Sequence, residues 1–207
     1  MLPKQVTSNA QLRKEGLSKA GIEQMSAALK LFPTPFKGIY YLPIAEERNG
    51  WFIEKPLKAL SMALRIYLKA NEFYFSCETA EEFFGLKWTP SGAVHIVNTV
   101  RSGRVDLEKR IQRNKAKGTY RAKKVAHLLS FYGREIVFHK VASLKGTKVK
   151  ETPYGRFATK AQIKADKKRF GEDKPRGKKY ISDELFNKLL EENLKKDKNL
   201  LARLHYL

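Results

Sequence analysis

The chain has 207 residues, of which 42% are hydrophobic and 11% aromatic, so it can form a folded core and is not an intrinsically disordered protein. It has no apolar run long enough to span a membrane, no signal-peptide-like start and only one cysteine, which excludes an internal disulfide and predicts a cytoplasmic protein. The formal net charge is +21, and residues 101–180 alone hold 25 Lys/Arg against 7 Asp/Glu. The positive charges of such a block repel one another unless a polyanion binds to them. We therefore favour nucleic acid as the binding partner over an acidic protein or an anionic membrane surface.

The first 43 residues predict two short helices and a strand. Ser8 and Gln11 have the spacing of a capping box, and the helix that follows should close at Gly16. Ser18 should cap a second helix, which the apolar spacing extends to Phe32, and the stretch FKGIYYLP (36–43) reads as a strand. Helix, tight turn, helix and strand is the order of a winged helix-turn-helix, whose second helix reads the major groove of DNA. A helical hairpin beside a strand is the alternative.

The rest of the chain alternates helices and strands and predicts an α+β fold. We expect a core helix over 57–68, a short helix from Ser76 or Thr79 to Gly85, and a loop over 86–93. That loop would divide an N-terminal domain, 1–88, from a basic α+β domain, 89–207. In the second domain we expect a hairpin turning at Ser102-Gly103, helices over 108–117 and 119–133, a strand over 134–141, a basic loop over 143–155 and a basic helix over 159–171. Residues 182–206 predict a charge-neutral amphipathic helix, or a pair of helices, that packs on its own core, forms a homodimer or binds a toxin partner.

The sequence carries no recognisable catalytic or metal-binding motif, so we predict neither an enzyme nor a cofactor. The histidines show no metal-ligand spacing with one another or with Cys77; they are His95, His127, His139 and His205. A metal-dependent nuclease would need an Asp and then Glu-x-Lys on a neighbouring strand. Asp106 ends a predicted strand and Glu108 and Lys109 follow it, while the strand after these offers Glu135 and Lys140. The spacing of five puts Glu135 and Lys140 on opposite faces of that strand, so the pattern fails. A nuclease with an unrecognised site stays a rival hypothesis.

Binding of nucleic acid is better supported, because the basic block cannot be buried. Three residues of the second helix, Lys19, Gln24 and Lys30, should approach the groove, and Lys37 should touch a phosphate. Ten more residues should make phosphate contacts, which position a protein without specifying sequence: Arg101, Arg104, Arg110, Arg113, Arg121, Lys123, Lys124, Lys167, Lys168 and Arg169. The main alternative is a structured-RNA-binding protein, for example one associated with the ribosome or with tRNA, that stacks bases on Tyr120, Tyr132 or Tyr154.

Several short motifs of residues 8–100 resemble the AbiEi family of antitoxins from type IV toxin–antitoxin systems. The matching positions are Gly38, Tyr40, Leu42 and Pro43 of a "GxYxLP" strand, then Ser76, Thr79, Ala80, Gly85 and Leu86 of the following helix. The resemblance implies a winged-helix transcriptional repressor of its own operon, with a C-terminal domain that counteracts a nucleotidyltransferase-type toxin. The chain departs from that pattern at its start, which lacks room for the first helix, and in the charge of its second half. The resemblance, taken with this charge, implies that residues 101–180 contribute much of the DNA binding.

Overall fold

The structure is a computed structural model that describes residues 5–172, and it is an α+β fold with two sheets. The chain divides into two units, Met1–Phe170 and Gly171–Leu207, and the first is compact. The amphipathic helix predicted over 182–206 lies outside the described residues.

Residues 5–41 form a small antiparallel sheet with two helices inserted into it. Its strand order is β1-β3-β2, and Val6 pairs with Tyr41, which in turn pairs with Phe32. The elements are β1 (Val6–Ser8), α1 (Asn9–Lys14), α2 (Lys19–Ala27), β2 (Phe32–Pro33) and β3 (Ile39–Tyr41).

Both predicted helix starts are confirmed. The Ser8 hydroxyl accepts a hydrogen bond from the Gln11 amide at 3.2 Å, and the Ser18 hydroxyl accepts one from the Gly21 amide at 3.0 Å. The predicted extension of the second helix to Phe32 is wrong. The helix ends at Ala27, Leu29 takes a left-handed φ of 52°, and Phe32 belongs to β2, where it pairs with β3.

A second sheet of six strands forms the rest of the core. Its order is β6-β7-β5-β4-β9-β8, with parallel pairing of β5 to β7 and of β4 to β9 and antiparallel pairing elsewhere. The strands are β4 (Phe73–Phe75), β5 (Ala93–Asn98), β6 (Gly103–Asp106), β7 (Glu135–Lys140), β8 (Val149–Thr152) and β9 (Gly155–Ala158).

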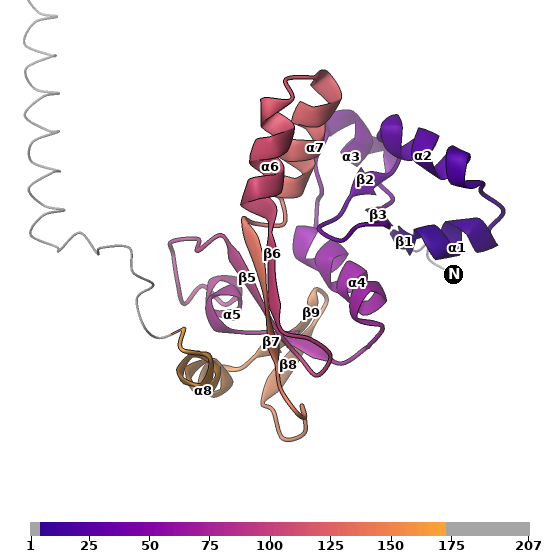
Figure 1. The fold of residues 1–207 in the computed structure, drawn as a ribbon. Helices are drawn as coiled ribbons and strands as arrows, with labels where there is room; N and C mark the ends of the chain where they lie inside the picture. The colour runs from indigo at the N-terminus through magenta and orange to yellow at the C-terminus, as the bar shows by residue number, and fades with distance from the viewer. Residues whose placement is uncertain (1–4, 173–207) are drawn as a thin grey trace, which may run out of the picture. The chain divides into compact units, whose positions relative to one another are not determined.

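Helices cover both faces of this sheet. The helices that follow β3 are α3 (Ala45–Gly50), α4 (Pro56–Leu68), α5 (Cys77–Phe83), α6 (Leu107–Ala116), α7 (Tyr120–Ser130) and α8 (Lys160–Phe170). Figure 1 shows α4 on one side of the sheet, next to the small N-terminal sheet, and α5 with α8 on the other. Side chains of β7 alternate accordingly: Phe138 lies against Tyr67 of α4, whereas His139 stacks on Phe170 of α8.

The predicted core helix over 57–68 and the basic helix over 159–171 are confirmed as α4 and α8. Two other expectations are wrong. The strands on either side of Ser102-Gly103 do not form a hairpin, because β5 and β6 each pair with β7, which lies between them. The segment expected as a basic loop over 143–155 contains β8 and runs through a tight turn into β9.

The boundary predicted near residue 88 stays a prediction. It falls between β4 and β5, and these two strands are antiparallel neighbours in the six-stranded sheet.

Candidate nucleic-acid interface

The α6–α7 hairpin concentrates positive charge on two adjoining helices. Residues 107–130 hold eight Lys/Arg and one Glu. The Asp106 carboxylate accepts from the Lys109 amide at 2.7 Å to start α6, and the Thr119 hydroxyl accepts from the Ala122 amide at 3.3 Å to start α7. Apolar side chains on the inner faces, among them Ile111 and Leu129, are buried. Six of the eight basic side chains are exposed on a hairpin whose inner faces are fixed by the core, and Arg110 and Lys124 are half-buried.

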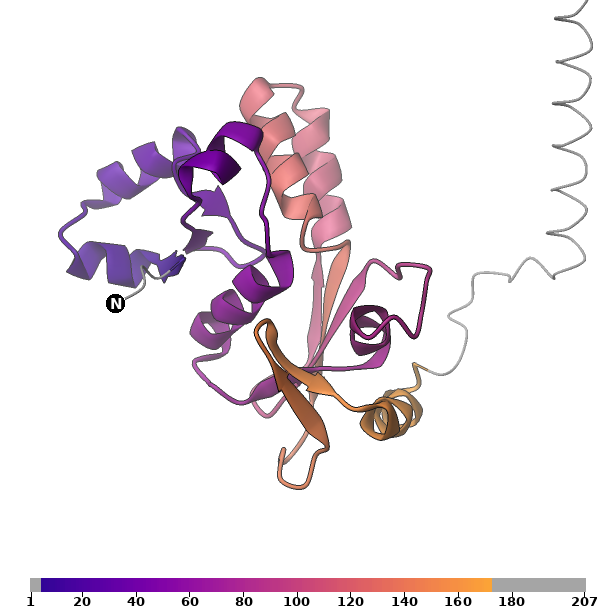
Figure 2. The ribbon, with the colours of Figure 1, turned by 180° about the vertical axis from the view of Figure 1, so that it is seen from behind.

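The hairpin lies beside the N-terminal sheet and its helices (Figure 2). Lys124 of α7 places its ammonium 4.7 Å from the centre of the Trp51 ring, after the end of α3. The guanidinium of Arg121 reaches the carbonyl of Ser26 in α2 at 3.5 Å, and that of Arg110 donates to the carbonyl of Pro35. Helix α2 and the outer faces of α6 and α7 thus belong to one region of the molecule.

Ten of the fourteen predicted contact residues are exposed: Lys19, Gln24, Lys30, Lys37, Arg104, Arg113, Arg121, Lys123, Lys168 and Arg169. They do not form one surface. Those on α2 and the α6–α7 hairpin lie at one end of the compact unit, whereas α8, with Lys168 and Arg169, lies at the other end (Figure 1).

The other four predicted contact residues are half-buried and engaged with the protein's own groups. Arg101 lies over the ring of Tyr67 and donates to its hydroxyl, and Lys167 pairs with Glu81 at 3.0 Å. Burial lowers the pKa of Arg110, whose guanidinium is held at the Pro35 carbonyl. The fourth is Lys124. Among the exposed residues, Arg104 also has a partner, the carboxylate of Glu135 at 3.3 Å.

The loop between β2 and β3 is folded onto the core. Thr34, Pro35 and Phe36 are buried, the Thr34 hydroxyl donates to the Ile39 carbonyl at 2.8 Å, and the Phe36 ring stacks on Tyr67 with centroids 4.1 Å apart. Lys37 is the exposed residue at its tip. Only this side chain of the loop tip is available to a phosphate.

The three tyrosines proposed as stacking platforms have different environments. Tyr120, at the start of α7, is 68% exposed and lies 5.4 Å from the Lys124 ammonium. Tyr132 is 2% exposed, and burial raises the pKa of its hydroxyl. Tyr154 is half-buried and packs edge-on against Phe83. Only Tyr120 offers a ring face to a base.

The carboxylates considered for a nuclease come together but are otherwise occupied. Asp106 and Glu135 are register partners across β6 and β7, which places their side chains next to each other. Asp106 caps α6 and Glu135 pairs with Arg104. Each of the two carboxylates thus already has a structural partner: the Lys109 amide for Asp106 and the Arg104 guanidinium for Glu135.

A cluster of residues that the sequence did not single out together lies on the face of the sheet where His139 stacks on Phe170 of α8. Cys77, His95 and His139 bring their sulfur and ring nitrogen atoms within 4.8 Å of one another, and no other group of three such ligands occurs among residues 5–172. Their separations along the chain, 18 and 44 positions, match no local motif. The pairing of β5 with β7 brings them together, and no signal in the sequence predicts that pairing.

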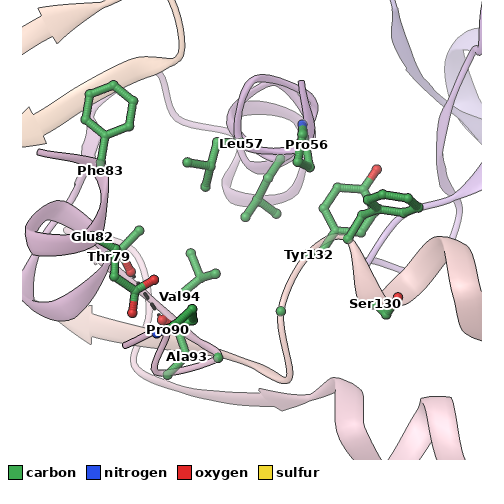
Figure 3. Close-up of a pocket in the computed structure, with 14 residues that line it drawn as sticks. Pro56, Leu57, Thr79, Glu82, Phe83, Pro90, Ala93, Val94, Ser130 and Tyr132 are labelled. Atoms are coloured by element: carbon green, nitrogen blue, oxygen red, sulfur yellow. Dashed lines mark hydrogen bonds between the residues drawn. The ribbon is translucent and has the colours of Figure 1, made fainter. Parts of the chain in front are cut away.

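A pocket of about 400 Å³ opens between α4, α5 and the C-terminal end of α7. Figure 3 shows its lining, which is mostly apolar and includes Leu57, Phe83, Val94 and Tyr132. The one carboxylate in the lining, Glu82, accepts from the Ser91 amide at 2.6 Å. The pocket therefore lacks the positive groups that an anionic ligand requires.

None of the helices in the described part of the chain is long and apolar enough to cross a membrane. No family model matches the chain, and no significant match to it was found among curated proteins or among solved structures.

Proposed function

We propose that this protein is a sequence-specific, DNA-binding transcriptional regulator that holds the duplex against α2 and the α6–α7 hairpin. One observation carries the proposal: the basic α6–α7 hairpin lies beside α2, and the Arg121 guanidinium of the hairpin contacts the Ser26 carbonyl of that helix. Phosphates would be held by the hairpin while α2 approaches base edges. That division of labour between positioning and reading is general in protein–DNA complexes.

The arrangement of residues 5–41 supports α2 as the reading helix. Strand, helix, turn, helix and two antiparallel strands in the sheet order β1-β3-β2 agree with the part of a winged helix-turn-helix that follows its first helix. The turn passes through Gly16 at a φ of 93°, and Leu12, Ile22 and Leu31 hold the two helices together. Lys19 and Gln24 of α2 are exposed, and so is Lys30, which lies beyond the end of the helix at Ala27.

The AbiEi-like motifs extend the proposal to a repressor of its own operon and an antitoxin. Of the matching residues, Thr79 and Ala80 are buried in α5, and Tyr40 and Leu42 lie beside the small core under α1 and α2. A nucleotidyltransferase-type toxin is then the expected partner. Co-expression with the product of the neighbouring gene tests this part separately: the antitoxin role requires rescue of growth that this chain provides and an unrelated basic protein does not.

The DNA-binding proposal is tested by fluorescence anisotropy with three duplexes of equal length. These are DNA from upstream of the gene, the same DNA shuffled, and RNA, each titrated from about 50 to 200 mM salt, where six to ten phosphate contacts cost roughly a thousand- to a hundred-thousand-fold in affinity. We expect the upstream DNA to bind most tightly. Equal binding to the shuffled DNA would contradict sequence-specific reading.

A pair of charge-matched variants locates the surface. The double variant Arg113→Ala/Lys123→Ala removes two exposed charges of the hairpin, and Lys145→Ala/Lys148→Ala removes two exposed charges outside the predicted contact set. The proposal requires the first to weaken DNA binding much more than the second. Equal losses would mean that only net charge matters.

Structured RNA is the second candidate ligand, because Tyr120 is exposed next to basic side chains. Stacking on an aromatic ring contributes about 1–3 kcal/mol per unpaired base. Preference for RNA together with a large loss in Tyr120→Ala would replace the DNA proposal.

A further inference from the structure

Three potential metal ligands converge between the six-stranded sheet and the helices α5 and α8. They are the sulfur of Cys77 and the ring nitrogens of His95 and His139, all within 4.8 Å of one another. The Nδ1 of His95 lies 3.0 Å from the Nε2 of His139, and the two rings are nearly parallel, with an angle of 7° between them.

Strand register places the two histidines on one face. His95 of β5 is opposite Val137 of β7, and His139 is opposite Val97, so the histidines form a diagonal pair of a parallel ladder. Diagonal neighbours on one face lie close enough for long side chains to meet. The juxtaposition is thus fixed by the central pairing of the sheet, the β5–β7 ladder of six residue pairs.

Hydrogen bonds hold Cys77 against the same strand from both sides. The amide of Ser76 donates to the His95 carbonyl at 3.1 Å, and the amide of His95 donates to the Thr79 hydroxyl at 2.7 Å. Cys77 lies between these two attachment points. The backbone of Cys77 is therefore held next to the backbone of His95.

The backbone of Cys77 has an uncommon conformation. Its φ is +49°, in the left-handed region that residues other than glycine rarely adopt. Such conformations cost free energy and are found preferentially at functional sites. Within residues 5–172 three other non-glycine residues share a positive φ: Leu29, Trp51 and Lys69. All three lie just after the end of a helix, whereas Cys77 opens one.

The surroundings shield the cluster from water. Cys77 and His95 have 0% exposure, and the ring of Phe170 stacks on His139 with centroids 4.1 Å apart. Ser76, next to Cys77, donates to the buried carboxylate of Asp166 at 2.6 Å. Ligands that are themselves fixed by outer hydrogen bonds and by an apolar cover are typical of protein metal sites.

We propose that Cys77, His95 and His139 bind one zinc ion. A thiolate with two imidazoles is a donor set that zinc prefers, and it lacks the oxygen ligands that magnesium and calcium require. Two nitrogens bound to one tetrahedral zinc at about 2.0–2.1 Å lie roughly 3.3 Å apart, close to the 3.0 Å between the present pair. With ring centroids 5.3 Å apart, the two nitrogens now point at each other, so both rings have to turn toward Cys77 for their lone pairs to meet at one ion. The fourth position is taken by water or by a small donor. The ion links β5, β7 and the start of α5, and the site is independent of nucleic-acid binding.

Cobalt is the probe for the test, because a tetrahedral site with a thiolate ligand gives visible d–d bands and a sulfur-to-cobalt charge-transfer band. The full chain, without a polyhistidine tag, is stripped with a chelator, titrated with Co²⁺ under reducing conditions and then back-titrated with Zn²⁺. We expect saturation at one Co²⁺ per chain, a charge-transfer band, displacement by Zn²⁺ and a higher melting temperature with Zn²⁺.

Two ligand variants and one control make the result decisive. Cys77→Ser should abolish the charge-transfer band, and His139→Gln should weaken Co²⁺ binding by more than the about 10–100-fold that loss of an outer-shell partner costs. His127→Gln changes an exposed histidine of α7 and should behave as the original chain. The half-buried His139 gives a folded variant even if Cys77→Ser does not fold. Absence of the charge-transfer band in the original chain, or equal Co²⁺ affinity in His139→Gln, would overturn the proposal.

Discussion

The hydroxyl of Ser76 donates a hydrogen bond to the carboxylate of Asp166 at 2.6 Å, across 90 positions of sequence. The hydroxyl of Tyr74 donates to the same oxygen at 3.1 Å, and the amide of Gln162 donates to the other oxygen at 2.9 Å. Asp166 is 2% exposed. This single carboxylate therefore attaches α8 to β4 and to the start of α5.

Replacement of Asp166 by alanine should destabilise the protein, because it leaves buried donors on Ser76 and Tyr74 without their acceptor. We expect a decrease of about 1–3 kcal/mol in the free energy of unfolding for each donor left unsatisfied. Urea unfolding followed by circular dichroism measures it. The neighbouring exposed Lys168→Ala should stay within about 0.5 kcal/mol of the original chain. A similar loss in both variants would show that the network contributes no specific stability.

Tyr132→Phe should leave stability unchanged or raise it. The Tyr132 hydroxyl is buried and has no hydrogen-bond partner among the described residues, so its removal deletes an uncompensated polar group. Tyr74→Phe is the matched control, since it removes a hydroxyl that donates to Asp166. We expect the control alone to lower the melting temperature. If Tyr132→Phe lowered the melting temperature and Tyr74→Phe did not, the Tyr132 hydroxyl would contribute to stability and the prediction would be wrong.

Stability should fall in alkaline solution. Burial raises the pKa of Tyr132 above its ordinary value of 10.0, and burial with the Glu47 carboxylate does the same for Tyr41. The folded state then holds protons that the unfolded chain releases, so the contribution is complete below about pH 10 and is lost as the pH rises further. Unfolding titrations on both sides of that pH should show the decrease. Tyr132→Phe should make it shallower, and an unchanged dependence would argue against a raised pKa in the folded state.

Gly133→Ala should be more damaging than Gly146→Ala. Both glycines have positive φ, 89° and 78°, so a side chain costs about 1–2 kcal/mol at each. A Cβ at Gly133 would lie 2.8 Å from the carbonyl oxygen of Gly92, whereas nothing lies within 4 Å at Gly146. We expect about 1–3 kcal/mol of additional destabilisation at Gly133 from this overpacking. Equal melting temperatures would mean that the backbone near Gly92 adjusts freely.

Base reading and phosphate contact should separate in single variants. Gln24→Ala should cost about 1–3 kcal/mol on the preferred DNA and relax preference at one base pair, whereas Arg113→Ala should weaken all duplexes alike and reduce the salt slope by about one contact. Anisotropy at several salt concentrations, with a panel of single-base changes, measures both effects. If Gln24→Ala weakened binding equally on every duplex, α2 would contact the DNA backbone and not the base edges.

Local signals were sufficient where a structure depends on neighbours in sequence. Ser8 and Ser18 cap helices as their positions predict, because a cap involves residues only three positions apart. The apolar run over 57–68 likewise predicts α4, and the density of charge after residue 100 predicts a basic surface.

The sequence by itself determined the α+β class, most helices and the basic character of α6 and α7, all of which follow from composition and short-range spacing. Only the tertiary structure decided that β7 lies between β5 and β6, because strand order depends on contacts between distant segments that no local pattern encodes. The same pairing brings His139 to His95 and Cys77. The tertiary structure also decided which basic side chains face outward. Arg101 and Lys167 carry the same charge as the exposed Arg113, yet Arg101 is held by Tyr67 and Lys167 by Glu81.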